Sequence, residues 1–166
     1  MVKVKDDYTL RALERQDEAV LWEMLMYAAH ESSVATVRDN PDLTRYVQGW
    51  GRSGDIGIVA MHKDKSVGAA WLRLWSGSEK GYGYVADEIP ELAIAMGPNY
   101  QGQGIGSALL TQILAMAQNK FPAVSLSTRV DNPATRLYQR TGFVRVPETE
   151  VGNRTGGVSV TMIYNF

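Results

Sequence analysis

The sequence contains no cysteine among its 166 residues. This absence excludes disulfide bonds, a thiolate nucleophile, zinc sites built on cysteine and iron–sulfur clusters. No apolar run approaches the ~20 residues that a membrane-spanning helix needs. Residues 1–7 (MVKVKDD) are charged and lead into no apolar segment, so we expect no secretory signal there. We therefore expect a cytoplasmic protein without a membrane partner.

An excess of charge of one sign is also missing. The chain has 17 Lys and Arg against 18 Asp and Glu, which gives a net charge of −1. Nucleic-acid-binding domains usually concentrate positive charge, so we expect no nucleic-acid partner. The hydrophobic share of 45% and the charged share of 21% are ordinary for a globular protein. The length predicts a single domain over residues 1–166, and we expect no metal site in it.

Hydrophobic periodicity predicts alternating strands and helices. Strands are predicted at residues 8–12, 56–61, 66–74, 92–96, 124–130, 143–146 and 158–164. Helices are predicted from Asp17, expected to cap the first turn, to about Ala29; from about Asp42, with Leu43, Tyr46, Val47 and Trp50 on one side; from Ile105 to before Pro122; and from Pro133 to Thr141, with Gly142 as a left-handed cap. The predicted fold is α/β, with a mixed, mostly antiparallel sheet flanked by helices. Because a helix connects them, its strands at 92–96 and 124–130 are expected to form a parallel pair.

A glycine cluster follows the apolar strand at residues 92–96, and its sequence from Tyr100 to Ser107 is YQGQGIGS. Glycines before a helix leave backbone N–H groups unpaired and unshielded, and together with the helix dipole these groups suit a phosphate. Three phosphate-binding patterns compete. The P-loop pattern fails because Gln103 stands where its lysine must be. The dinucleotide fingerprint fits weakly because Ser107 replaces its third glycine.

The third pattern is Q/R-x-x-G-x-G/A, which residues 101–106 (QGQGIG) satisfy. Residues 132–143 (NPATRLYQRTGF) add an Asn that leads a short helix ending in Tyr and then Gly-Phe. On these two motifs the sequence resembles the GCN5-related N-acetyltransferase family over about residues 91–146. The chain departs from many relatives in having one position fewer between Asn132 and Tyr138.

The resemblance implies the acyl-CoA N-acyltransferase fold, in which the parallel pair at residues 92–96 and 124–130 splays apart. It also implies acetyl-CoA as co-substrate. The expected contacts of its diphosphate are the backbone groups of Gly102, Gln103, Gly104, Ile105, Gly106 and Ser107. The resemblance also implies that the backbone of Ile94, Ala95 and Met96 pairs with the pantetheine arm as if with a short strand. Asn132 is a further expected contact of the cofactor.

Two residues are candidates for proton transfer. By resemblance, Tyr138 donates a proton to the leaving thiolate; alternatively it is a core aromatic with its hydroxyl at the surface. Glu91 is a candidate base, with Asp87 and Glu88 as alternatives; otherwise these acids form a solvated strand entrance. A backbone N–H near Met96 is expected to stabilise the oxyanion.

Aromatic residues fall into two groups. Trp22 and Trp71 lie on apolar stripes and are predicted to be core residues. Trp75, Tyr82 and Tyr84 lie in or beside a glycine-containing segment at residues 75–88. They form either a wall of the acceptor site, which we favour, or a satellite apolar cluster.

The function that the resemblance implies is transfer of the acetyl group of acetyl-CoA to a primary amine, by direct attack in a ternary complex. A non-catalytic acyl-CoA-binding or sensing module is the alternative, and a nucleotide-binding domain of another kind is a third. The acceptor, a small-molecule or peptide amine, is left open by the sequence. Dimers are common among relatives, so a homodimer is compatible with the resemblance.

Overall fold

The computed structural model describes residues 8–152 and 156–166. Contacts divide the described chain into two units, one of residues 8–73 with 93–116 and the other of residues 74–92 with 117–166. Strand β4 (Glu91–Met96) begins in the second unit and ends in the first. The single domain over residues 1–166 stays a prediction, and the expectation for residues 1–7 lies outside the described residues.

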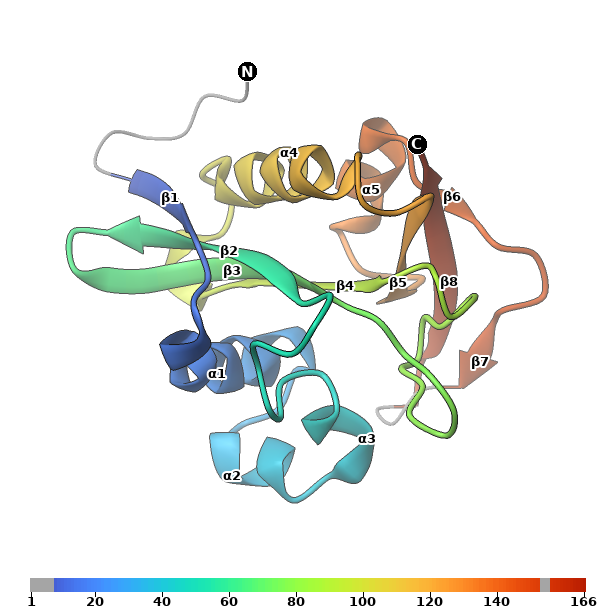
Figure 1. Ribbon diagram of the computed structural model, residues 1–166, viewed down its shortest axis with the longest axis horizontal. Helices are drawn as coiled ribbons and strands as arrows, with labels where there is room; N and C mark the ends of the chain where they lie inside the picture. The colour runs from blue at the N-terminus through green and yellow to red at the C-terminus, as the bar shows by residue number, and fades with distance from the viewer. Residues whose placement is uncertain (1–7, 153–155) are drawn as a thin grey trace. The chain divides into compact units, whose positions relative to one another are not determined.

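The sheet of the first unit has the order β1-β2-β3-β4. Strands β1 (Tyr8–Ala12), β2 (Ile56–His62) and β3 (Lys65–Arg73) pair antiparallel, and β2 and β3 form the predicted hairpin. Helices α1 (Glu18–Ala28) and α4 (Ile105–Ala117) lie on opposite faces of this sheet (Figure 1). Its fully buried apolar side chains include Leu21, Val59, Ala70, Leu109 and Ile113. Trp22 and Trp71 are buried, as predicted.

The start of α1 differs from the prediction. Asp17 is the N-cap residue of α1, but its carboxylate accepts no hydrogen bond from the first turn of that helix. It instead accepts from the backbone N–H of Glu14 at 2.7 Å and from both terminal nitrogens of Arg11 at 2.9 Å. The prediction that the Asp17 carboxylate caps the first turn of α1 is therefore wrong. The carboxylate instead closes the preceding 3₁₀ turn, η1 (Arg15–Asp17).

The segment between α1 and β2 holds two short helices, α2 (Val34–Arg38) and α3 (Pro41–Thr44). The helix predicted from Asp42 is thus wrong in its extent, and α2 was not predicted. Positive φ angles at Gly49 (71°) and Gly51 (102°) take the backbone out of helical conformation. The four apolar residues of the predicted stripe are nevertheless buried: Leu43, Tyr46, Val47 and Trp50.

A buried ion pair holds this segment to the end of β3. Arg73 donates from Nε and Nη2 to the carboxylate of Asp55 at 3.1 and 2.8 Å, and both side chains are 1% exposed. Its Nη1 donates to the backbone carbonyls of Arg45 and Gln48 at 2.9 and 2.7 Å. One guanidinium therefore ties together three points of the loop before β2.

The second unit is built on β5 (Ala123–Arg129) and β8 (Val158–Asn165), which pair antiparallel. On one side of β5 lies β4, parallel to it, and on the other side of β8 lie β6 (Val144–Arg145) and β7 (Val151–Gly152). Helix α5 (Thr135–Thr141) ends at Gly142, whose φ of 124° makes it the predicted left-handed cap. The fold is a mixed α/β fold with the predicted parallel pair, although β6 is shorter than predicted and β7 was not predicted.

Candidate active site

In the first unit, the glycine-rich loop joins β4 to α4. After β4, Gly97 donates its N–H to the carbonyl of Val67 at 2.9 Å, and the 3₁₀ turn η2 (Pro98–Tyr100) follows. Gly102 and Gly104 then adopt positive φ angles of 74° and 83°. L-residues other than glycine avoid this conformation, so the two glycines set the path of the loop into the helix.

The backbone amides of this loop point to a ligand. Within the described residues, the N–H groups of residues 102–107 donate to no backbone carbonyl, whereas Ala108 already donates to Gly104 at 3.1 Å. Free amides at the start of a 13-residue helix, aided by the helix dipole, are a favourable site for an anion. A Cβ at Gly102 would find no atom within 4 Å, so the loop is open there. These residues fit the diphosphate of acetyl-CoA.

The predicted pantetheine contacts lie on β4. Ala95 is 7% exposed, while Ile94 and Met96 are half-buried. The neighbouring strand β3 approaches closely, since a Cβ at Gly68 would lie 3.2 Å from the carbonyl oxygen of Ala95. The parallel register of β4 with β5 consists of one residue pair, Glu91 with Ser125.

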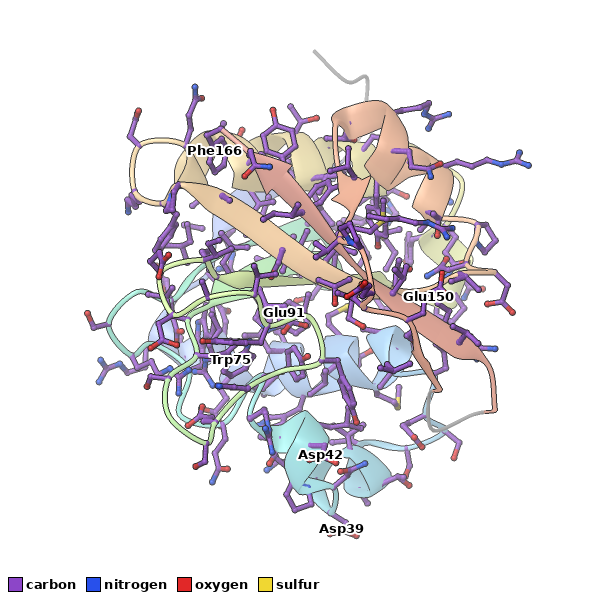
Figure 2. The ribbon with its side chains drawn as sticks, turned by 90° about the vertical axis from the view of Figure 1, so that its right-hand side faces the viewer. Asp39, Asp42, Trp75, Glu91, Glu150 and Phe166 are labelled. Atoms are coloured by element: carbon purple, nitrogen blue, oxygen red, sulfur yellow. The ribbon has the colours of Figure 1, made fainter. Side chains whose placement is uncertain are left out.

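In the second unit, Glu91 is enclosed rather than solvated. The residue is 2% exposed, and its Oε1 accepts a hydrogen bond from Nε1 of Trp75 at 2.9 Å. Figure 2 shows these two side chains side by side. The solvated strand entrance proposed for Glu91 is thus wrong, whereas Asp87 and Glu88 are exposed.

The segment at residues 75–88 is anchored at two points. Trp75 is 1% exposed, so it belongs to a buried cluster and not to an open wall. Ser125 donates from Oγ to the carbonyl of Gly83 at 2.7 Å. A Cβ at Gly83 would lie 2.7 Å from the carbonyl carbon of Leu126, so this close approach requires glycine. Nothing in the sequence pairs Trp75 with Glu91, because the contact depends on how this segment folds back.

Tyr84 and Tyr82, the other aromatics of the segment, have different surroundings. The hydroxyl of Tyr84 donates to Oδ1 of Asp87 at 2.6 Å, while Tyr82 is 44% exposed. These two residues remain candidates for the acceptor wall.

Tyr138 lies on α5 and is 7% exposed. Its ring packs edge-on against Phe143, with the ring centroids 6.0 Å apart. Burial raises the pKa of Tyr138 to about 12. Its hydroxyl makes no hydrogen bond to another described residue. The hydroxyl oxygen is not fully enclosed, because no side-chain oxygen of the described residues is both fully enclosed and unpaired. With a pKa of about 12, the hydroxyl is neutral at physiological pH.

Asn132 has a structural role that the sequence left open. Its Oδ1 accepts from the backbone N–H of Ala134 at 2.9 Å, and its carbonyl accepts from Thr135 at 3.0 Å. Both bonds close the turn that starts α5. Its expected contact with the cofactor stays a prediction.

The candidate residues are thus divided between the two units. The first unit holds residues 94–96 and 102–107 on β4 and its following loop, and the second holds Glu91, Asn132 and Tyr138. Among residues 8–152 and 156–166, no group of three or more His, Asp and Glu side chains is placed to hold a metal ion. In the same part of the chain, no helix is long and apolar enough to cross a membrane.

A mixed sheet with a parallel β4/β5 pair, and a glycine-rich loop between β4 and the start of α4, is the arrangement of the acyl-CoA N-acyltransferase fold. The model of the acetyltransferase (GNAT) family matches residues 11–143. The match covers most of the chain, which therefore belongs to the GNAT acetyltransferase family.

Solved structures show the same fold. The structure of yncA from Salmonella typhimurium with its cofactor acetyl-CoA is 20% identical, with a TM-score of 0.73 over 96% of this chain and 94% of that one. The ribosomal-protein-S18-alanine N-acetyltransferase of Escherichia coli is 22% identical, with a TM-score of 0.66 over 95% and 93% of the two chains. The spermidine/spermine N-acetyltransferase SpeG of Vibrio cholerae is 21% identical, with a TM-score of 0.61 over 96% and 92%. Comparison with curated proteins gives no match.

Proposed function

We propose that this protein transfers the acetyl group of acetyl-CoA to a primary amine, by direct attack within a ternary complex. The observation that carries the proposal is the row of free amides at residues 102–107 before α4, in a chain of the GNAT family. These amides would hold the diphosphate, and the backbone of residues 94–96 would run along the pantetheine arm. When bound, acetyl-CoA supplies the acetyl group as a thioester. Holding both substrates together makes the attack effectively intramolecular.

Tyr138 would act as a hydrogen-bond donor from its neutral hydroxyl. Its pKa of about 12 lies above the ~8.5 of an ordinary thiol, so complete proton transfer from Tyr138 to a thiolate is uphill by roughly 5 kcal/mol. A hydrogen bond donated to the departing sulfur avoids that cost and still stabilises the negative charge. The raised pKa therefore favours stabilisation of the leaving group over full protonation by this residue.

Glu91 would receive the proton that the amine loses. The hydrogen bond from Trp75 fixes the orientation of its carboxylate, and its burial removes competing water. Asp87 is less suited because its carboxylate accepts from Tyr84 in an exposed position. A Glu91→Gln variant with an unshifted pH–rate profile would remove this residue as the base.

The experiment that tests the proposal measures thiol release from acetyl-CoA with a panel of amines, and confirms the product by its mass gain of one acetyl group. The panel includes polyamines and alanine peptides, because two solved neighbours are named as a spermidine/spermine N-acetyltransferase and a ribosomal-protein-S18-alanine N-acetyltransferase. We expect initial-rate plots that intersect, as for a ternary complex; parallel lines would indicate a covalent enzyme intermediate. Binding of acetyl-CoA without thiol release on any amine would favour the alternative, a non-catalytic acyl-CoA-binding module.

A further inference from the structure

The side chain of Gln103 is held at both of its polar ends. It lies between Gly102 and Gly104, the two loop residues with positive φ. Its Oε1 accepts a hydrogen bond from the hydroxyl of Tyr8 at 2.7 Å, and its Nε2 donates to the carbonyl of Asn99 at 3.1 Å. Tyr8 and Gln103 are 95 positions apart in the chain, so this contact joins β1 to the glycine-rich loop.

The direction of the two bonds is determined by their chemistry. The backbone carbonyl of Asn99 can only accept, so the NH₂ group of Gln103 must face it. The amide oxygen of Gln103 then faces Tyr8, whose hydroxyl must donate. Both bonds are satisfied in one orientation of the amide, and together they link Tyr8 through Gln103 to the turn at Asn99.

The ring of Tyr8 is itself fixed by its neighbours. Tyr8 is the cross-strand partner of His62 on β2, with ring centroids 4.9 Å apart. Tyr100 of η2 packs edge-on against Tyr8 at 6.2 Å and against His62 at 6.0 Å. The loop is therefore attached to the β1–β2 edge twice, by the ring of Tyr100 and by the side chain of Gln103.

We infer that Tyr8 is a positioning residue for the cofactor loop, which it orders before the cofactor binds. The inference rests on the proposed function in one respect, that the amides of residues 102–107 bind acetyl-CoA. A loop that is already ordered loses less conformational entropy on binding, which strengthens the binding. Tyr8 acts through Gln103, so it affects cofactor affinity and not the turnover number at saturating cofactor.

Hydrogen exchange of the unliganded protein tests the ordering directly. Tyr8→Phe keeps the ring and its packing and removes only the donor to Gln103. We expect the amide of Tyr100, which donates to the carbonyl of Gly97 at 3.0 Å, to exchange several-fold faster in Tyr8→Phe than in the parent protein. Tyr27→Phe is the matched control, because it also removes a hydroxyl that donates to a side chain, Oε1 of Glu23 at 3.1 Å, but on α1. Equal exchange of the Tyr100 amide in Tyr8→Phe and the parent protein would overturn the inference.

Calorimetric binding of acetyl-CoA tests the consequence for affinity. We expect Tyr8→Phe and Gln103→Leu each to raise the Kd about 3- to 10-fold, the effect of one net hydrogen bond. The double variant should be no weaker than the weaker single variant, because both remove the same bridge. The turnover number of Tyr8→Phe at saturating acetyl-CoA should equal that of the parent protein. The Kd of Tyr27→Phe should also equal that of the parent protein. Fully additive losses, or a reduced turnover number with unchanged Kd, would overturn the inference.

The two measurements separate the inference from the proposed function. If the parent protein does not bind acetyl-CoA, the proposed function fails, whereas the exchange comparison still decides whether Tyr8 orders the loop.

Discussion

Burial changes the acid–base behaviour of Tyr138, and a single hydroxyl can be removed to test its role. We expect Tyr138→Phe to lower the turnover number by about 100-fold, the lower range for loss of one hydrogen-bond donor to a developing negative charge. The Kd of acetyl-CoA should stay nearly unchanged, because the diphosphate is expected to bind to backbone amides elsewhere. Steady-state kinetics together with calorimetric binding separate these effects. An unchanged turnover number would remove Tyr138 from the mechanism.

The same residue predicts a change in stability at alkaline pH. The pKa of Tyr138 is about 12 in the folded protein, above the ordinary value of 10, so unfolding releases its proton between these values. Stability is therefore lost as pH rises from 10 through 12, by roughly 2–3 kcal/mol from this residue. Denaturant unfolding of the parent and Tyr138→Phe at several pH values checks this, since the variant should lose less stability. Equal losses would show that burial does not raise this pKa.

At the scale of elements, the turn from β4 into α4 depends on glycine at position 104. Gly104 has a φ of 83°, a conformation that costs an alanine about 1–2 kcal/mol. The Gly104→Ala variant can avoid this strain only if the backbone of the loop moves. We expect the Kd of acetyl-CoA to rise about 10-fold or more. Gly152→Ala on β7 is the matched control, because its Cβ would meet no atom within 4 Å and its φ is not positive. Binding of acetyl-CoA by Gly104→Ala as tight as that of the control would contradict this account of the loop.

The Arg73–Asp55 pair predicts how strongly the loop before β2 is held. Asp55→Asn removes the charge that compensates a buried guanidinium and should lower the free energy of unfolding by about 3–5 kcal/mol. Asp42→Asn serves as the control: the Asp42 side chain is 64% exposed in its pair with Arg45, so the loss should be below about 1 kcal/mol. Urea unfolding measures both variants. Similar, small losses would show that the buried pair contributes little.

Elements with local determinants could be predicted from the sequence. Alternating residues and a short polar turn predicted the β2–β3 hairpin, and Gly142 marked the end of α5 because only glycine readily takes a φ of 124°. The glycine-rich loop was also predictable, since its pattern lies within a few consecutive residues. The candidate contacts at residues 94–96 come from the resemblance to the family and stay a prediction.

Features that depend on distant contacts could not be predicted. The stripe Leu43, Tyr46, Val47 and Trp50 has helical spacing, but Gly49, Gly51 and the bonds from Arg73 to backbone carbonyls favour turns. The carboxylate of Asp17 accepts hydrogen bonds from the guanidinium of Arg11 and none from the first turn of α1. Glu91 accepts a hydrogen bond from Trp75, and Gln103 accepts one from Tyr8. Neither partner is a neighbour in the sequence, so no local pattern indicates these bonds.

At the scale of the whole molecule, the family is clear and the acceptor is open. The family model matches residues 11–143, whereas the solved neighbours share about a fifth of their residues and show the fold. In the proposed function, the acetyl-CoA site depends on backbone amides, and a short glycine pattern in the sequence indicates where they lie. The acceptor side depends on side chains that vary within one fold, so the amine must be found by experiment.

The central claim is that the amides of residues 102–107 bind the diphosphate of acetyl-CoA. The most direct test is a titration of ¹⁵N-labelled protein with acetyl-CoA, with NAD and ATP as comparison ligands. We predict saturable shifts that are largest at the amides of residues 102–107, with acetyl-CoA binding more tightly than either nucleotide. Unmoved amides at these positions while acetyl-CoA saturates the protein, or tighter binding of NAD or ATP at them, would contradict the claim.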